Sequence, residues 1–187
     1  MKRFLSVLFF LANGLLITAV RAQTAPAHNK PFQTITYHPI PAGPSVFGVF
    51  EGRPPCPVLA RQLHLLTDAD CVKLKMNIVF YRNPATLKPD SFVLSIVGSG
   101  DVVKQEGGSY RYQEIRGQWS IVKGRPPYPA MEIYRLMPHN GGTTLNLLRG
   151  DENVLFILDQ HNAVMAGNPD FSFTLNKVEL VPGKQLP

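Results

Sequence analysis

The dominant pattern in this chain is an alternation of apolar and polar residues, which is clearest between Val72 and Phe80. Apolar side chains occupy every second position of this run, and Lys73, Lys75 and Asn77 stand between them. Successive side chains of a β-strand point to opposite faces, so the run predicts a strand with one buried face. The same period of two recurs in later runs: Phe92–Ile96, Ile115–Ile121, Leu145–Leu147, Val154–Leu158 and Phe171–Leu175.

Turn-forming residues separate these runs and predict tight connections between the strands. They gather at 98–101, 107–108, 124–127, 140–142 and 167–170. With Val46–Phe50 counted, the chain contains about eight or nine strands, near the number that closes a small barrel. Closure also removes exposed strand edges. We therefore predict an all-β fold, a small antiparallel β-barrel that occupies residues 45–181 as a single domain.

Residues 57–66 fit two local structures. Leu59, Leu63 and Leu66 lie at helical spacing, and Pro57 suits the first position of a helix. Leu63 and Leu65 also lie at strand spacing. The pattern favours one short helix slightly and leaves a strand open.

The first 22 residues have the layout of a secretory signal peptide. Lys2 and Arg3 precede a long apolar run, and Val20-Arg21-Ala22 places small residues at a cleavage point before Gln23. The alternative is an N-terminal anchor helix, because an apolar run of roughly 17 residues is near the lower length for spanning a membrane. We predict cleavage, no stable membrane span afterwards, and a periplasmic or secreted protein. Residues 23–44 then form a flexible leader and 182–187 a tail.

The charge of the mature chain excludes one class of partner. The whole chain has 19 Lys plus Arg and 13 Asp plus Glu. Loss of the signal peptide removes three of the basic residues and leaves a net charge of about +3. The remaining basic residues are scattered, whereas a nucleic-acid surface needs a cluster of them. We therefore predict no nucleic-acid partner.

Four short motifs follow one another in an informative order. Phe50-Glu51-Gly52 precedes Pro55-Cys56, Gly117-Gln118-Trp119 stands in mid-domain, and Leu155–Asp159 and Phe171–Leu175 come near the end. Together they resemble the NlpE family, which is named for an outer-membrane lipoprotein linked to copper tolerance and envelope stress. The resemblance implies a lipocalin-like barrel and a place in the bacterial envelope. It also points to the loop of Gly52, Pro55 and Cys56.

Two features depart from that family. Its metal or redox motif is Cys-x-x-Cys, but here Cys56 matches the first position and Leu59 occupies the second. The founding member carries a lipid anchor, and no cysteine lies at the predicted cleavage point here. Metal sensing and lipid anchoring therefore do not follow from the resemblance.

The candidate chemistry beyond this motif is sparse. Cys56 could bind a soft metal together with other ligands, but such a site needs three or four that converge. The available partners are scattered: His64, Met76, Met131, Met137 and His139. No Gly-x-Ser-x-Gly, His-Glu-x-x-His or P-loop motif is present. We predict no metal site, no cofactor and no enzyme activity.

The two cysteines, Cys56 and Cys71, are candidates for a disulfide, because exported proteins meet an oxidising compartment. A tight hairpin over residues 61–80 would place them too far apart, whereas a short helix over 57–66 could bring them together. We favour the bond.

Four aromatic residues, Tyr110, Tyr112, Trp119 and Tyr134, could line a ligand cavity or fill the barrel, and filling is favoured. We expect Trp119 in the core, on one face with Ile115 and Ile121.

The sequence therefore predicts a non-enzymatic envelope protein that acts in recognition or in stress or metal-related sensing. The alternatives are a lipocalin-like carrier of a small apolar ligand and an inhibitor barrel. The partner, an envelope protein or a small apolar ligand, and the oligomeric state stay open.

Overall fold

The computed structural model describes residues 32–33, 40–67, 69–99, 111–124, 126 and 128–179. The predicted signal peptide, most of the predicted leader, the tail, the 107–108 turn and Tyr110 lie outside these residues. The described part contains one helix, α1, at Cys56–Gln62. Its strands are β1 Phe32–Gln33, β2 Val46–Gly52, β3 Lys73–Arg82, β4 Pro89–Ser99, β5 Arg111–Lys123, β6 Glu132–Pro138, β7 Leu145–Arg149, β8 Val154–Ile157 and β9 Thr174–Glu179.

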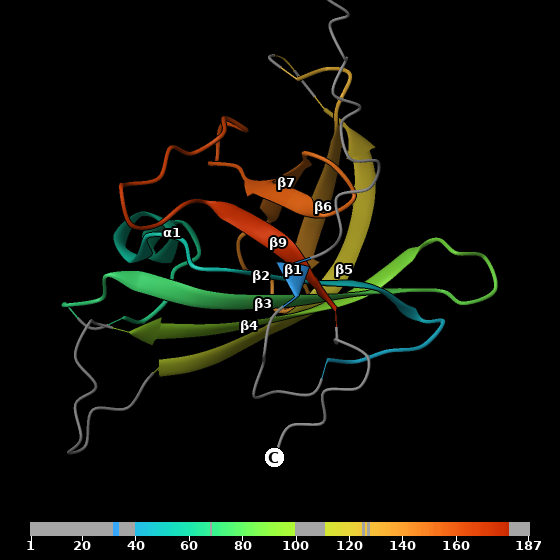
Figure 1. Ribbon diagram of the computed structural model, residues 1–187, viewed down its shortest axis with the longest axis horizontal. Coiled ribbons are helices and arrows are strands. Elements are labelled where there is room, and N and C mark those ends of the chain that lie inside the picture. Colours follow the sequence, from blue (N-terminus) through green and yellow to red (C-terminus); the bar gives the residue numbers. More distant parts are fainter. Residues whose placement is uncertain are drawn as a thin grey trace, which may run out of the picture.

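Eight of these strands form a closed antiparallel barrel (Figure 1). Strands β2 to β8 pair in chain order, each with the next. Strand β9 pairs with both β8 and β2 and so closes the ring. In the segment predicted as a leader, β1 pairs with the end of β9 in parallel, through Phe32 and Val178. The all-β barrel and its short helix are confirmed.

The barrel interior is filled by the apolar positions that alternate along the strands. Leu74, Met76, Ile78 and Phe80 of β3 all point inward, because they share one face of a strand with period two. The largest buried side chains come from nearly every strand and from the helix: Phe50, Leu59, Phe92, Leu94, Ile96, Leu136, Leu145, Leu147 and Leu155. An eight-stranded barrel is just wide enough for side chains to fill it, and these residues do so.

Two smaller apolar clusters lie outside the ring. Val49, Val79 and Val178 pack on the outer face of β2, β3 and β9, with Ile40 against them. A second cluster joins Ile133, Leu148 and Leu158. The alternation of apolar and polar residues is therefore interrupted at these places, because apolar side chains also pack on the outer face of the barrel. No helix among the described residues is long and apolar enough to cross a membrane.

Candidate functional site

The motif loop predicted around Cys56 leads directly into helix α1. Pro57 lies in the first turn, where a helix needs no backbone N–H, so proline is tolerated there. The helix has only seven residues and no side-chain cap at its N-terminus. A helix this short is marginal by itself, so contacts with the barrel must hold it.

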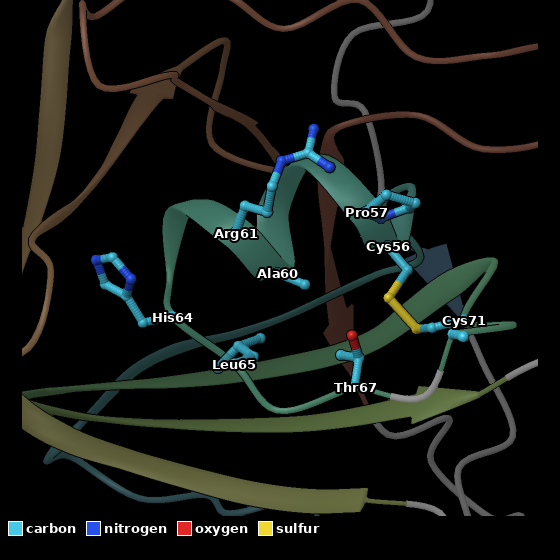
Figure 2. A pocket seen from close by; sticks show the side chains of 9 residues that line it. Cys56, Pro57, Ala60, Arg61, His64, Leu65, Thr67 and Cys71 are labelled. Carbon is cyan, nitrogen blue, oxygen red and sulfur yellow. A yellow bond between two sulfur atoms is a disulfide. The ribbon is translucent and has the colours of Figure 1, made fainter.

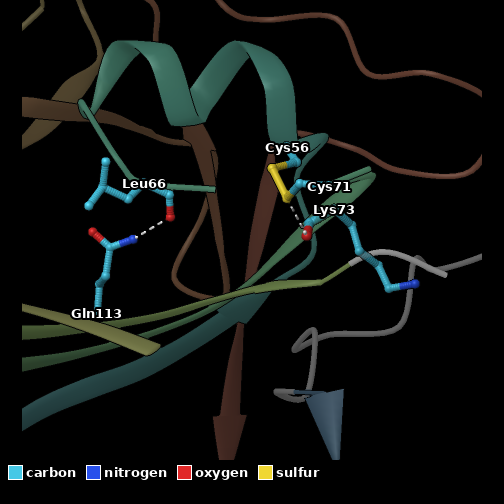
Figure 3. Close-up of a disulfide and its surroundings, with 5 residues drawn as sticks. All are labelled: Cys56, Leu66, Cys71, Lys73 and Gln113. Atoms are coloured by element: carbon cyan, nitrogen blue, oxygen red, sulfur yellow. Dashed lines mark hydrogen bonds between the residues drawn. A yellow bond between two sulfur atoms is a disulfide. The ribbon is translucent and has the colours of Figure 1, made fainter. Parts of the chain in front are cut away.

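A disulfide (Figure 3) and two backbone hydrogen bonds tie the start of α1 to the start of β3 and the residues just before it. Cys56 and Cys71 are bonded, with their Cα atoms 5.8 Å apart. The Cys56 N–H donates to the Val72 carbonyl oxygen, and the Leu74 N–H donates to that of Pro54, each at 2.9 Å. The predicted disulfide is therefore present, and the helical alternative for residues 57–66 is the one that allows it.

The opposite side of α1 packs on one end of the barrel. Leu59, Ala60 and Leu63 are buried and belong to the same apolar cluster as the barrel interior. The Gln62 side chain donates a hydrogen bond of 3.0 Å to the Leu158 carbonyl oxygen. Helix α1 thus closes this end of the barrel and keeps a fixed position on it.

A hollow of about 430 Å³ lies beside the disulfide and is open to solvent. Figure 2 shows Ala60, Leu65 and Thr67 between the helix and the strands below it, while Arg61 and His64 extend outward at the rim. The other lining residues are Cys56, Pro57, Ala69 and Cys71. The hollow therefore combines Ala60 and Leu65 on its floor with the polar side chains of Arg61 and His64 at its rim.

Two exposed apolar side chains belong to residues that are sequence neighbours of the lining residues Pro57, Leu65 and Thr67. Val58 is 44% exposed and Leu66 is 71% exposed. The Leu66 backbone is held in place because its carbonyl oxygen accepts a hydrogen bond of 3.1 Å from the Gln113 side chain (Figure 3). We call the surface formed by Pro57, Val58, Arg61, His64 and Leu66 the helix face.

Of the residues considered as metal ligands, His64 lines the same hollow as Cys56, but the methionines do not join them there. Cys56 is in the disulfide, and Met76 is buried inside the barrel. Met131 and Met137 are exposed near opposite ends of β6. Within the described ranges, no group of three or more His, Cys, Asp or Glu residues could hold a metal ion.

The aromatic residues considered as a ligand cavity are divided between the two faces of the sheet. Trp119 and Tyr134 lie inside the barrel with their ring centroids 5.2 Å apart, and Phe47 and Phe80 pack against both. Tyr112 instead lies on the outer surface, where its hydroxyl contacts Ser95 and donates to Glu114. These residues therefore do not line one cavity.

Three groups away from the helix face have shifted acid–base properties. Burial raises the pKa of the Tyr134 hydroxyl. The carboxylate of Glu132 accepts a hydrogen bond from Arg149 and so raises the pKa of that guanidinium. On the outer surface, hydrogen bonds from Tyr112 and Arg116 lower the pKa of the Glu114 carboxyl.

Close packing explains two glycines of the sequence motifs. A Cβ atom on Gly52 would collide with the Thr174 carbonyl oxygen, and one on Gly117 would collide with that of Met137 and with the Phe92 ring. Gly52 and Gly117 are therefore required by the packing of the barrel.

The sequence did not indicate Val58, Arg61 and Leu66 as a shared surface, because their exposure depends on which local structure residues 57–66 adopt.

Comparisons with protein-family models, with curated proteins and with solved structures found no match to this chain.

Proposed function

We propose that this protein is an exported, non-enzymatic recognition module of the cell envelope, and that it contacts an envelope protein through the helix face. The observation that carries the proposal is the combination of exposed Val58 and Leu66 with an open hollow at a rigid position. The disulfide, the barrel contacts of α1 and the Gln113 hydrogen bond all hold this surface in place before any partner arrives. Preorganisation of this kind lowers the entropic cost of binding.

The filled interior supports recognition over transport inside the barrel. A carrier of the lipocalin type needs space for its ligand among the strands. Here Phe47, Phe80, Trp119 and Tyr134 occupy the interior and contact one another. The surface rather than the interior is the better place for binding.

More specifically, we propose an NlpE-like role in sensing the state of the cell envelope. The motif residues Gly52, Pro55 and Cys56 lie at the end of β2 and the start of α1, next to the helix face. Because Cys56 is bonded to Cys71, it is not a free thiolate. The sensing that we propose therefore depends on contact with a partner and does not use Cys56 as a metal ligand.

One observation favours a second candidate, a carrier that holds a small apolar ligand outside the barrel. The hollow of about 430 Å³ falls in the size range of small-molecule sites. Its floor includes Ala60 and Leu65, and Arg61 at the rim could meet a polar head group. A carrier of this kind would bind a free small molecule without any protein partner.

Site-specific photocrosslinking in the producing cells tests the first proposal. The photoreactive residue p-benzoylphenylalanine replaces Val58 or Leu66, which are exposed, and in the control it replaces Tyr112 on the outer face of β5. We expect one discrete protein adduct from both helix-face positions and none from position 112. Equal labelling from all three positions, or no protein adduct at 58 and 66, would contradict the proposal.

A further inference from the structure

The hairpin between β3 and β4 carries a leucine in a backbone conformation that leucine rarely adopts. Leu87 has a φ of 57° and a side chain that is 60% exposed. In this left-handed region the Cβ atom crowds the following carbonyl oxygen, so glycine or asparagine is the usual occupant. Leu87 therefore strains the backbone and adds little to the apolar core.

The loop around Leu87 is held firmly by Asn83. The Asn83 side-chain oxygen accepts hydrogen bonds of 2.9 Å from the N–H groups of Ala85 and Thr86. The backbone of Asn83 accepts from Leu87 at 2.8 Å and donates to the Lys88 carbonyl oxygen at 2.9 Å. The Leu87 side chain is thus presented from a defined backbone.

This hairpin projects from the barrel on the side away from α1 (Figure 1). Strand β3 begins beside the disulfide and ends at the hairpin, and its ten residues span roughly 30 Å. The base of the hairpin is fixed by Arg82, whose N–H donates to the Ser45 carbonyl oxygen at 2.7 Å and whose Nε donates to that of Pro44 at 3.1 Å. Leu87 is therefore far from the helix face and rigidly attached.

We propose that Leu87 is the anchor of a second interaction surface, and that it inserts into an apolar pocket with an acidic rim on a protein partner. A strained leucine at an exposed site, where it adds little to the core, points to a role outside the fold. Arg82 and Lys88 flank the loop, and residues 82–88 contain no acidic side chain. Asp90, the nearest acid along the chain, lies on β4, where it accepts a hydrogen bond from Ser91. The charge next to Leu87 is therefore positive.

A second copy of this chain is a poor fit for that pocket. The hollow beside the disulfide has the right scale, but Arg61 and His64 stand at its rim. Arg61 carries the same charge sign as Arg82 and Lys88, so the contact would be repulsive. The charges favour a different protein.

The first test separates a role in binding from a role in folding. Leu87→Asn places a residue that tolerates the left-handed region, so we expect the Tm to rise by about 2–4 °C. The control is Ala85→Ser in the same loop, which should leave the Tm unchanged. A Tm that falls in Leu87→Asn would show that the leucine supports the fold, and this result would overturn the proposal.

The second test asks what Leu87 touches. With p-benzoylphenylalanine at position 85, crosslinking in the producing cells is compared between the chain with Leu87 and the chain with Leu87→Asn. We expect a protein adduct that falls at least tenfold in Leu87→Asn and that maps to an apolar pocket with acidic neighbours. The partner so identified, purified alone, should bind wild type at least tenfold more tightly than Leu87→Asn in calorimetry. An adduct with lipid, an adduct unaffected by the substitution, or no adduct would overturn the proposal. The helix face lies at the other end of β3, so its crosslinks are scored independently.

Discussion

The indole N–H of Trp119 donates a hydrogen bond of 2.6 Å to the backbone carbonyl oxygen of Tyr81. Trp119 lies on β5 and Tyr81 on β3, so the bond connects two strands that are separated by β4 in the sheet. The pairing of β3 with β4 shifts between Phe80 and Arg82, and Pro89, opposite Arg82, has no N–H to donate. Trp119 supplies a donor at the place where the regular ladder is interrupted.

Trp119 should therefore stabilise the barrel in two ways, through its buried ring and through its hydrogen bond, and two substitutions separate these contributions. Trp119 is only 3% exposed, and truncation of a buried aromatic residue to Ala typically costs about 3–5 kcal/mol. Trp119→Phe keeps an aromatic ring but leaves the Tyr81 carbonyl without its donor, which costs about 1–3 kcal/mol. Urea denaturation followed by far-UV circular dichroism measures both. Wild-type stability in Trp119→Ala would show that the indole is not a core residue.

Gly117→Ala should also destabilise the protein, because the new Cβ would meet the Met137 carbonyl oxygen and the Phe92 ring. Overpacking of a filled core costs about 1–3 kcal/mol. Gly98→Ala is the matched control on the neighbouring strand, because its Cβ would meet other atoms only at ordinary contact distances of 3.5 Å and more. We expect a lower urea midpoint for Gly117→Ala alone. Equal midpoints in the two variants would contradict the close approach of β5 and β6 at Gly117.

The disulfide should account for a substantial share of the stability. Its sequence separation is 15, and closing a loop of this length contributes about 3 kcal/mol in the chain-entropy account. The double variant Cys56→Ser with Cys71→Ser should lose about that amount in urea denaturation. Thiol counting on the denatured, unreduced protein from the producing cells should find no free thiol. Two free thiols per chain would refute the disulfide and make Cys56 available for other chemistry.

Alkaline pH should weaken the barrel through Tyr134. Burial raises the pKa of the Tyr134 hydroxyl above its value in the unfolded chain, so the unfolded state loses this proton first as the pH increases. The stability that depends on the neutral hydroxyl is fully present below about pH 10 and is lost as the pH rises through the folded pKa. Urea midpoints measured from about pH 8 to 11 should fall less steeply for Tyr134→Phe than for wild type. Parallel curves would contradict a buried, protonated Tyr134.

The strands were predictable because period-two alternation and turn residues agree along most of the chain. The interior of β3 follows directly from that pattern. Trp119 was also predicted correctly, whereas Ile121 on the same face is exposed because it lies near the end of β5. The closure by β9 between β8 and β2 joins distant segments, and no local pattern specifies it.

The candidate site was only partly predictable. Cys56 and Cys71 were identified as a pair, but the exposure of Val58 and Leu66 depends on the helix, which the leucine spacing there favours only slightly over a strand. Phe47 was missed because a register shift between Val46 and Gly48 interrupts the alternation at that residue. Tyr112 could have been separated from Trp119, since residues seven apart on one continuous strand lie on opposite faces.

The most direct test of the central claim is native mass spectrometry of the protein isolated from the cells that produce it, compared with the double variant Arg61→Glu and Leu66→Ser. Both residues are exposed, so the substitutions should change stability by no more than about 0.5 kcal/mol. We predict that wild type, with its mature chain beginning at Gln23, carries the mass of a protein partner and that the double variant lacks it. A wild-type spectrum of the mature chain alone, or with only a small molecule bound, would contradict recognition through the helix face.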